Sequence, residues 1–284
     1  MLDAHADVGE GPVWDARSET LVWVDIMANE LHRYNPTSGR DETTDVGQPV
    51  GCVALRRSGG VVLALRDGFA ALDAEAGEPR LLAPVEAARP QHRMNDGKCD
   101  SEGRFWAGTM GMKAEPGVGS LYRLDSDWSV AKVMGGVTIS NGLGWSPDDR
   151  TMYYTDTPTR MIQAFDYEPD SGRLGNRRSF VTITDGPGNP DGLAVDAEGF
   201  VWTALWPGWA VHRYSPAGDL DLVVSLPVAQ VASCTFGGRE LDDLYITTAA
   251  NGLSAADIAV QPHAGGIFVF RAGVPGLPVH EFAG

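Results

Sequence analysis

The stretch Pro190-Asp191-Gly192-Leu193, followed by Val201-Trp202-Thr203-Ala204 and then by Val211-His212-Arg213-Tyr214, decides the fold of this chain. An Asp-Gly pair opens a short apolar run, a turn containing Asp and Gly leads to a run with a large aromatic residue, and a third run ends at Ser-Pro. Aromatic and β-branched residues separated by Gly, Asp and Pro favour strands over helices. The stretch therefore predicts three consecutive β-strands within residues 190–214.

The same three-strand unit recurs six times along the chain. Its openings are Glu10-Gly11, Val50-Gly51, Asp96-Gly97, Asn141-Gly142, Asp191-Gly192 and, without the glycine, Ser233-Cys234. The large residue of the second strand is Trp23, Leu63, Trp106, Tyr154, Trp202 or Tyr245, at intervals of 40 to 48 residues. Each unit leaves room for a fourth, more variable strand, such as residues 40–46.

A period in the forties with about four strands per unit is typical of a β-propeller. The sequence therefore predicts an all-β fold: a six-bladed β-propeller with about four antiparallel strands per blade, forming a single domain over residues 1–284. The alternative is a β-sandwich with coincidental spacing. The propeller is favoured because three separate runs keep the same order in all six units.

The composition excludes several classes of partner. The chain has 284 residues, with 38 Asp or Glu against 22 Lys or Arg, and a formal net charge of −16. Such an acidic chain is a poor match for nucleic acid or an anionic membrane. Its three cysteines lack Cys-x-x-Cys spacing, and we see neither a signal peptide nor an apolar run of membrane length. We expect a cytoplasmic protein with reduced cysteines, whose oligomeric state is left open.

Ring symmetry predicts a metal site. The first strand of each propeller blade lines the central channel, so the residue before each opening glycine should lie at the channel mouth. Glu10, Asn141 and Asp191 would then meet there with two carboxylates and one amide oxygen, which are ligands that Ca²⁺, Mg²⁺ and Mn²⁺ prefer. Asp and Asn also commonly cap turns at strand starts. Three such residues at equivalent positions favour the metal over three unrelated caps.

Arg93 and Asn95 precede or open the third of these first strands and should stand beside the same mouth, where Asp96 could also reach. An arginine there can bind hydroxyl groups or an oxyanion through several N–H donors; the alternative is an ordinary surface arginine. The chain has no Gly-x-Ser-x-Gly, His-Glu-x-x-His or P-loop motif. His92 is the only histidine near the predicted mouth.

At these residues the chain resembles the senescence-marker-protein/gluconolactonase/regucalcin-like family. The resemblance rests on segments spread through nearly the whole chain: Gly9-Glu10-Gly11-Pro12-Val13-Trp14, Arg93-Met94-Asn95-Asp96-Gly97-Lys98, Ala107-Gly108-Thr109-Met110, Ile139-Ser140-Asn141-Gly142-Leu143, Pro190-Asp191-Gly192-Leu193, Phe236-Gly237-Gly238 and Ala264-Gly265-Gly266-Ile267-Phe268.

The resemblance implies a six-bladed propeller with one divalent cation and hydrolysis of a sugar-acid lactone of the glucono-, xylono- or arabinono- type to the aldonic acid. It makes Glu10, Asn141 and Asp191 the metal ligands and gives Arg93 and Asn95 contacts with the substrate. Calcium is favoured, with zinc, manganese, magnesium and iron open. The family often has a sugar-contacting glutamate where this chain has Lys113. Lys113 is therefore a candidate substrate-binding residue. Because it differs from the family's glutamate, the identity of the lactone is left open.

These expectations give a mechanistic hypothesis. The cation would polarise the lactone carbonyl, water would attack it, and Asp191 would be the catalytic carboxylate that accepts the water's proton. Two alternatives remain open. The first is a non-catalytic calcium-binding or protein-binding propeller, and the second is an esterase of broader specificity with the same metal site.

Overall fold

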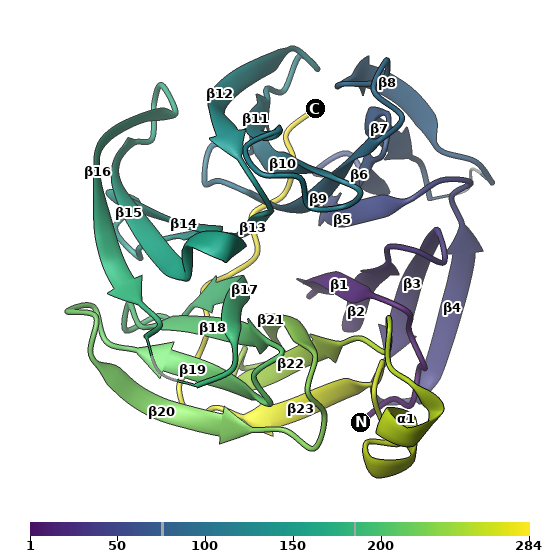
Figure 1. The fold of residues 1–284 in the computed structure, drawn as a ribbon. Coiled ribbons are helices and arrows are strands. Elements are labelled where there is room, and N and C mark those ends of the chain that lie inside the picture. The colour runs from purple at the N-terminus through teal and green to yellow at the C-terminus, as the bar shows by residue number, and fades with distance from the viewer. Residues whose placement is uncertain (75–76, 185) are drawn as a thin grey trace.

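The computed structural model describes residues 1–74, 77–184 and 186–284, and its strands form six antiparallel sheets arranged as a ring (Figure 1). Each sheet is one blade, and in each the strands follow one another in chain order. This confirms the predicted all-β, six-bladed propeller.

The blades follow the repeat units of the sequence. Blade 1 contains β1 (Gly9–Asp15), β2 (Thr20–Asp25), β3 (Glu30–Asn35) and β4 (Arg40–Asp45). Blade 2 contains β5 (Val50–Leu55), β6 (Val61–Leu65), β7 (Gly68–Leu72) and β8 (Arg80–Pro84). Blade 3 contains β9 (His92–Cys99), β10 (Phe105–Gly111), β11 (Gly119–Leu124) and β12 (Val130–Val137).

Blade 4 contains β13 (Ser140–Trp145), β14 (Thr151–Asp156), β15 (Met161–Glu168) and β16 (Arg173–Thr182), with the 3-10 turn η1 (Thr157–Thr159) after β14. Blade 5 contains β17 (Asn189–Val195), β18 (Val201–Trp206), β19 (Ala210–Tyr214) and β20 (Leu220–Ser225). Blade 6 contains β21 (Val231–Gly237), β22 (Asp243–Thr248) and β23 (Ile267–Arg271), with helix α1 (Ala255–Val260) between the last two.

Blade 6 departs from the four-strand expectation because its sheet has three strands. The N-terminus completes its outer edge: Leu2 and Ile267 form an antiparallel bridge, with N–H to C=O distances of 2.9 and 2.8 Å in the two directions. The N-terminal segment therefore closes the ring.

The C-terminal segment crosses the ring instead of extending a sheet. The amide of Ala197 in blade 5 donates to Pro275, while the amide of Phe282 donates to Leu55 in blade 2 and that of Ala283 to Gly103 in blade 3. Figure 1 shows this segment as the yellow trace that runs past the inner strands. It ties together blades that are not neighbours in the ring.

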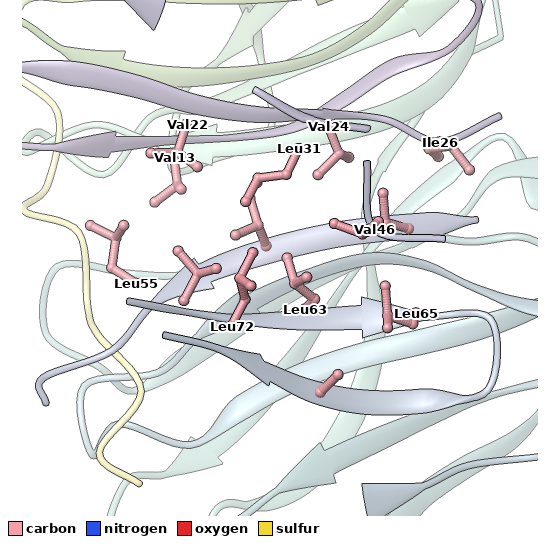
Figure 2. Packing of buried hydrophobic residues seen from close by; sticks show 14 residues of the cluster. Val13, Val22, Val24, Ile26, Leu31, Val46, Leu55, Leu63, Leu65 and Leu72 are labelled. Carbon is pink, nitrogen blue, oxygen red and sulfur yellow. The ribbon is translucent and has the colours of Figure 1, made fainter. Parts of the chain in front are cut away.

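Packing between adjacent blades buries the apolar faces of the strands. Between blades 1 and 2 the cluster includes Val22, Leu31, Leu55, Leu63 and Leu72, all with at most 4% of their surface exposed (Figure 2). Burying each such side chain contributes about 1.5–3 kcal/mol to folding.

The repeated tryptophans belong to this packing. Trp23, Trp106 and Trp202 are fully buried. In blades 3 and 5 the indole N–H donates to an aspartate six residues earlier, Trp106 to Asp100 at 2.7 Å and Trp202 to Asp196 at 2.9 Å. Among the residues that the structure describes, no helix is long and apolar enough to cross a membrane.

Candidate active site

A β-bulge interrupts the pairing of each first strand near its opening. The pairing register with the second strand shifts between Glu10 and Val13 in β1, between Ser140 and Leu143 in β13 and between Pro190 and Leu193 in β17. An extra residue in a bulge bends its strand and redirects its side chain. Ring symmetry predicted that the side chains at these openings converge. The bulge is the local backbone geometry found at those positions.

The opening glycines allow neighbouring first strands to approach each other closely. A Cβ at Gly142 would overlap with the carbonyl oxygen of Asp191 in the next blade, and a Cβ at Gly51 would overlap with the carbonyl oxygen of Asn95. Only a residue without a side chain fits such a contact. The glycines thus let the residues beside them come together around a small space.

That space is a cavity of about 370 Å³ at the start of the first strands. Its lining includes five residues predicted for the site: Glu10, Arg93, Asn95, Asn141 and Asp191. Apart from Arg93, these side chains are buried. Residues as far apart in the chain as Glu10 and Asp191, 181 positions, therefore contribute to one polar pocket. Their convergence is an observation, whereas their roles as ligands or substrate contacts remain predictions.

A directed chain of hydrogen bonds connects three blades across this pocket. Nη1 of Arg93 donates to Oδ1 of Asn95 at 2.5 Å, and Nδ2 of Asn95 donates to Oδ1 of Asn141 at 2.8 Å. Nδ2 of Asn141 then donates to Oγ1 of Thr157 at 2.7 Å, and Thr157 donates to the carbonyl oxygen of Pro190 at 2.8 Å. This series of hydrogen bonds ends at Pro190, next to Asp191, and fixes the orientation of the side-chain amides of Asn95 and Asn141.

The pocket concentrates negative charge away from water. Burial, and then the charge of Asp96, raise the pKa of Glu10 to about 8. Burial, followed by the charges of Glu10 and Asp96, raises the pKa of Asp191 well above its ordinary value. Burial lowers the pKa of Arg93 to about 10, although the carboxylates of Glu10 and Asp191 oppose that change. Clustered buried carboxylates of this kind favour a bound cation or a bound proton.

The donor set fits a hard divalent cation. Oδ1 of Asp191 is buried and has no hydrogen-bond partner among the described residues, which leaves an acceptor available at the pocket. Carboxylate and amide oxygens are the ligands that calcium and magnesium prefer. Within residues 1–74, 77–184 and 186–284, no three His, Cys, Asp or Glu side chains form a metal-binding group. A cation here would therefore depend on the amide of Asn141 together with the carboxylates of Glu10 and Asp191.

Some residues that the sequence placed near this pocket lie elsewhere in the structure. Lys113 is exposed and outside the cavity lining; its backbone N–H donates to Oε2 of Glu115 at 3.2 Å, and the next residue, Ala114, lines the cavity instead. Asp96 lines a smaller chamber deeper in the ring, because the bulge places Asn95 at the mouth. His92 is buried and its Nδ1 lies 2.6 Å from Oε2 of Glu86.

Of the lining residues that the sequence reasoning missed, four lie at or near second strands: Ile26, Met110, Thr157 and Trp206. They lie at or just after the ends of second strands β2, β10, β14 and β18. The repeat could have identified these four residues, because they occupy corresponding positions in their units. Trp206 lines the cavity, while Trp209 is 42% exposed.

The fold and the pocket define a class: six-bladed propellers with an oxygen-rich cavity at one end of the ring. A family model described as the SMP-30/gluconolactonase/LRE-like region matches residues 8–250. The chain belongs to this family, as the resemblance of its motifs predicted.

Individual relatives agree with this assignment. Regucalcin of Xenopus laevis is 40% identical over 98% of this chain and 95% of its own. The structure of a calcium-binding protein, regucalcin, from Agrobacterium tumefaciens superposes with a TM-score of 0.93, 30% identity and coverage of 99% and 95% of the two chains. A gluconolactonase from Xanthomonas campestris has a TM-score of 0.74 and 26% identity over 86% and 84%.

Proposed function

We propose that this protein hydrolyses a sugar-acid lactone, of the glucono-, xylono- or arabinono- type, with a divalent cation bound in this cavity. The observation that carries the proposal is the meeting of Glu10, Asn141 and Asp191 with Arg93 and Asn95 in one cavity of about 370 Å³. Membership in a family that includes gluconolactonases supports it.

The chain's residues have distinct parts in this reaction. Glu10, Asn141 and Asp191 would hold the cation, which when bound supplies Lewis-acid polarisation of the ester carbonyl. Nη1 of Arg93 is held by the carbonyl of Met94 at 3.0 Å and by Asn95, so its remaining N–H groups are oriented for substrate hydroxyls. Asn95 is fixed between Arg93 and Asn141 and helps to hold the ring of the lactone.

Asp191 is the proposed general base. Water adds to the carbonyl carbon as Asp191 accepts its proton, the bond between that carbon and the ring oxygen breaks, and the ring oxygen takes a proton to become the hydroxyl of the aldonic acid. The unpartnered Oδ1 of Asp191 is available for this contact.

A pH-drop assay on the three lactones and an aryl ester, with and without EDTA, tests the proposal. Spontaneous opening is subtracted by running an enzyme-free blank in parallel. We expect lactone turnover that EDTA abolishes and added Ca²⁺, Mn²⁺ or Zn²⁺ restores. Full activity in EDTA would contradict the cation requirement, and faster cleavage of the aryl ester would favour a broader esterase.

Calcium binding without catalysis is the second candidate, because the solved relative from Agrobacterium tumefaciens is described as a calcium-binding protein. It predicts stoichiometric calcium binding with no lactone opened faster than the blank. Metal analysis of the purified protein together with the lactone assay separates the two functions.

A further inference from the structure

The cavity has a polar floor and an apolar collar. The floor consists of Glu10, Asn95, Asn141 and Asp191. The collar consists of Val8, Ile26, Met110, Ile139 and Trp206. Val8 and Ile139 stand two residues before Glu10 and Asn141, which places them on the same side of the strand and one step nearer the cavity opening. Ile26 lies against Val8, with its N–H 3.0 Å from the carbonyl oxygen, and Met110 bridges to Ile139.

Polar groups beside the collar are already engaged. The hydroxyl of Thr157 accepts from Asn141 and donates to Pro190, which uses its single proton. Nδ2 of Asn251 donates to Oδ1 of Asp7 at 3.0 Å. Hydroxyl groups of a ligand at collar depth therefore have the free N–H groups of Arg93 and Oδ1 of Asn251 as partners.

The loop after β10 adds a methyl group and no polar side chain to this lining. Ala114 lines the cavity with its backbone in the left-handed region, at φ 54°. Its neighbours Lys113 and Glu115 are not part of the lining. The collar thus offers apolar surface on several sides and few hydrogen-bonding partners.

We infer that, among aldonolactones, the protein prefers those whose carbon farthest from the carbonyl carries no hydroxyl group, that is, 6-deoxyaldonolactones. This rests on the proposed lactonase function, which puts the carbonyl at the floor beside Asp191 and the far end of the molecule at the collar. A hydroxyl group that faces the apolar side chains of the collar, out of reach of Arg93 and Asn251, loses its hydration without gaining a partner, whereas a methyl group there gains from leaving water.

The test compares two lactones that differ by one oxygen atom. D-galactono-1,4-lactone and 6-deoxy-D-galactono-1,4-lactone share configuration and ring size, so their ratio of kcat/KM isolates the terminal hydroxyl. We expect the deoxy compound to be favoured about 10- to 100-fold. Equal values, or a preference for the hydroxylated compound, would overturn the inference.

A matched pair of variants assigns the preference to the collar. Met110→Gln adds an amide at nearly constant volume and should reduce the ratio toward 1, while Met110→Leu should preserve it. Ile26→Thr provides a second polar change on another blade, and thermal melting confirms that each variant is folded. If Met110→Gln and Ile26→Thr both fold and keep the wild-type ratio, the collar does not determine specificity.

Failure of the proposed function gives a different pattern. In that case neither galactonolactone nor gluconolactone opens faster than the enzyme-free blank, with or without added cation, and the inference falls with the function. Turnover of both galactonolactones without a deoxy preference leaves the lactonase intact and rejects the collar's role.

Discussion

Thr157 fixes the side-chain amide of Asn141. Oγ1 of Thr157 lies 2.7 Å from Nδ2 of Asn141 and 2.8 Å from the carbonyl oxygen of Pro190. A carbonyl oxygen only accepts, so Thr157 must donate to Pro190 and accept from Asn141. This turns Oδ1 of Asn141 toward Nδ2 of Asn95, where a second lone pair is left for a cation.

Thr157→Val should weaken divalent cation binding about 10-fold, because the amide of Asn141 loses the group that orients it. Thr157→Ser keeps the hydroxyl and should bind almost as the wild type does. Isothermal titration with Ca²⁺ measures both without relying on turnover. Equal dissociation constants for the valine and serine variants would show that Thr157 does not orient the ligand.

Asp191→Ala should abolish turnover by removing both a ligand and the proposed base. Asp191→Asn retains an oxygen donor but not a base, and its kcat should fall by about 10² to 10⁴. The measurement is kcat on gluconolactone at saturating cation, corrected for spontaneous opening. An alanine variant that keeps most of its kcat with metal bound would remove Asp191 from both roles.

Arg93→Ala should mainly raise KM, by about 10- to 100-fold, since charged hydrogen bonds to the substrate are lost. Arg93→Lys keeps the charge but not the several directed donors, and should lie between the alanine variant and the wild type. Initial rates over a range of lactone concentrations give both constants. An unchanged KM in the alanine variant would exclude a binding role for Arg93.

The cation-free protein should lose stability as the pH rises from about 5 to 8. Glu10 has its pKa raised from 4.5 to about 8, so between these values the folded chain holds a proton that the unfolded chain has released. The free energy of unfolding contributed by this proton is present below pH 4.5 and lost as the pH rises through 8. Added Ca²⁺ should therefore stabilise more at pH 8 than at pH 5.

Thermal melts in EDTA and in Ca²⁺ at several pH values measure this effect. Glu10→Gln removes the titrating group. Any pH dependence of the melting temperature that the wild type shows and this variant lacks is therefore due to Glu10. If the two proteins have the same pH dependence in EDTA, the raised pKa of Glu10 does not contribute to stability.

Gly142→Ala should destabilise the fold by about 1–3 kcal/mol, because its Cβ would overlap with the backbone of Asp191 in the next blade. Gly175→Ala is the matched control: no atom lies within 4 Å of its Cβ position, and its effect should be within about 0.5 kcal/mol. Urea unfolding gives both values. Similar midpoints for the two variants would refute a requirement for close contact at Gly142.

The repeat made much of this architecture predictable. Strand positions, the burial of Trp106 and Trp202 and the meeting of Glu10, Asn141 and Asp191 all follow from one unit copied around a ring. Lys113 shows the limit of such reasoning. Its place relative to the cavity depends on the path of a loop outside the repeat, where Ala114 takes a left-handed conformation.

The sequence by itself determined the number of blades, the order of their strands and which residues share equivalent positions, because local alternation and turn residues recur with a fixed period. Only the tertiary structure decided that Asn95 and not Asp96 faces the cavity, that Thr157 orients Asn141, and that the N-terminus closes blade 6. These depend on bulge register and on contacts between distant blades, which no single segment of the chain encodes.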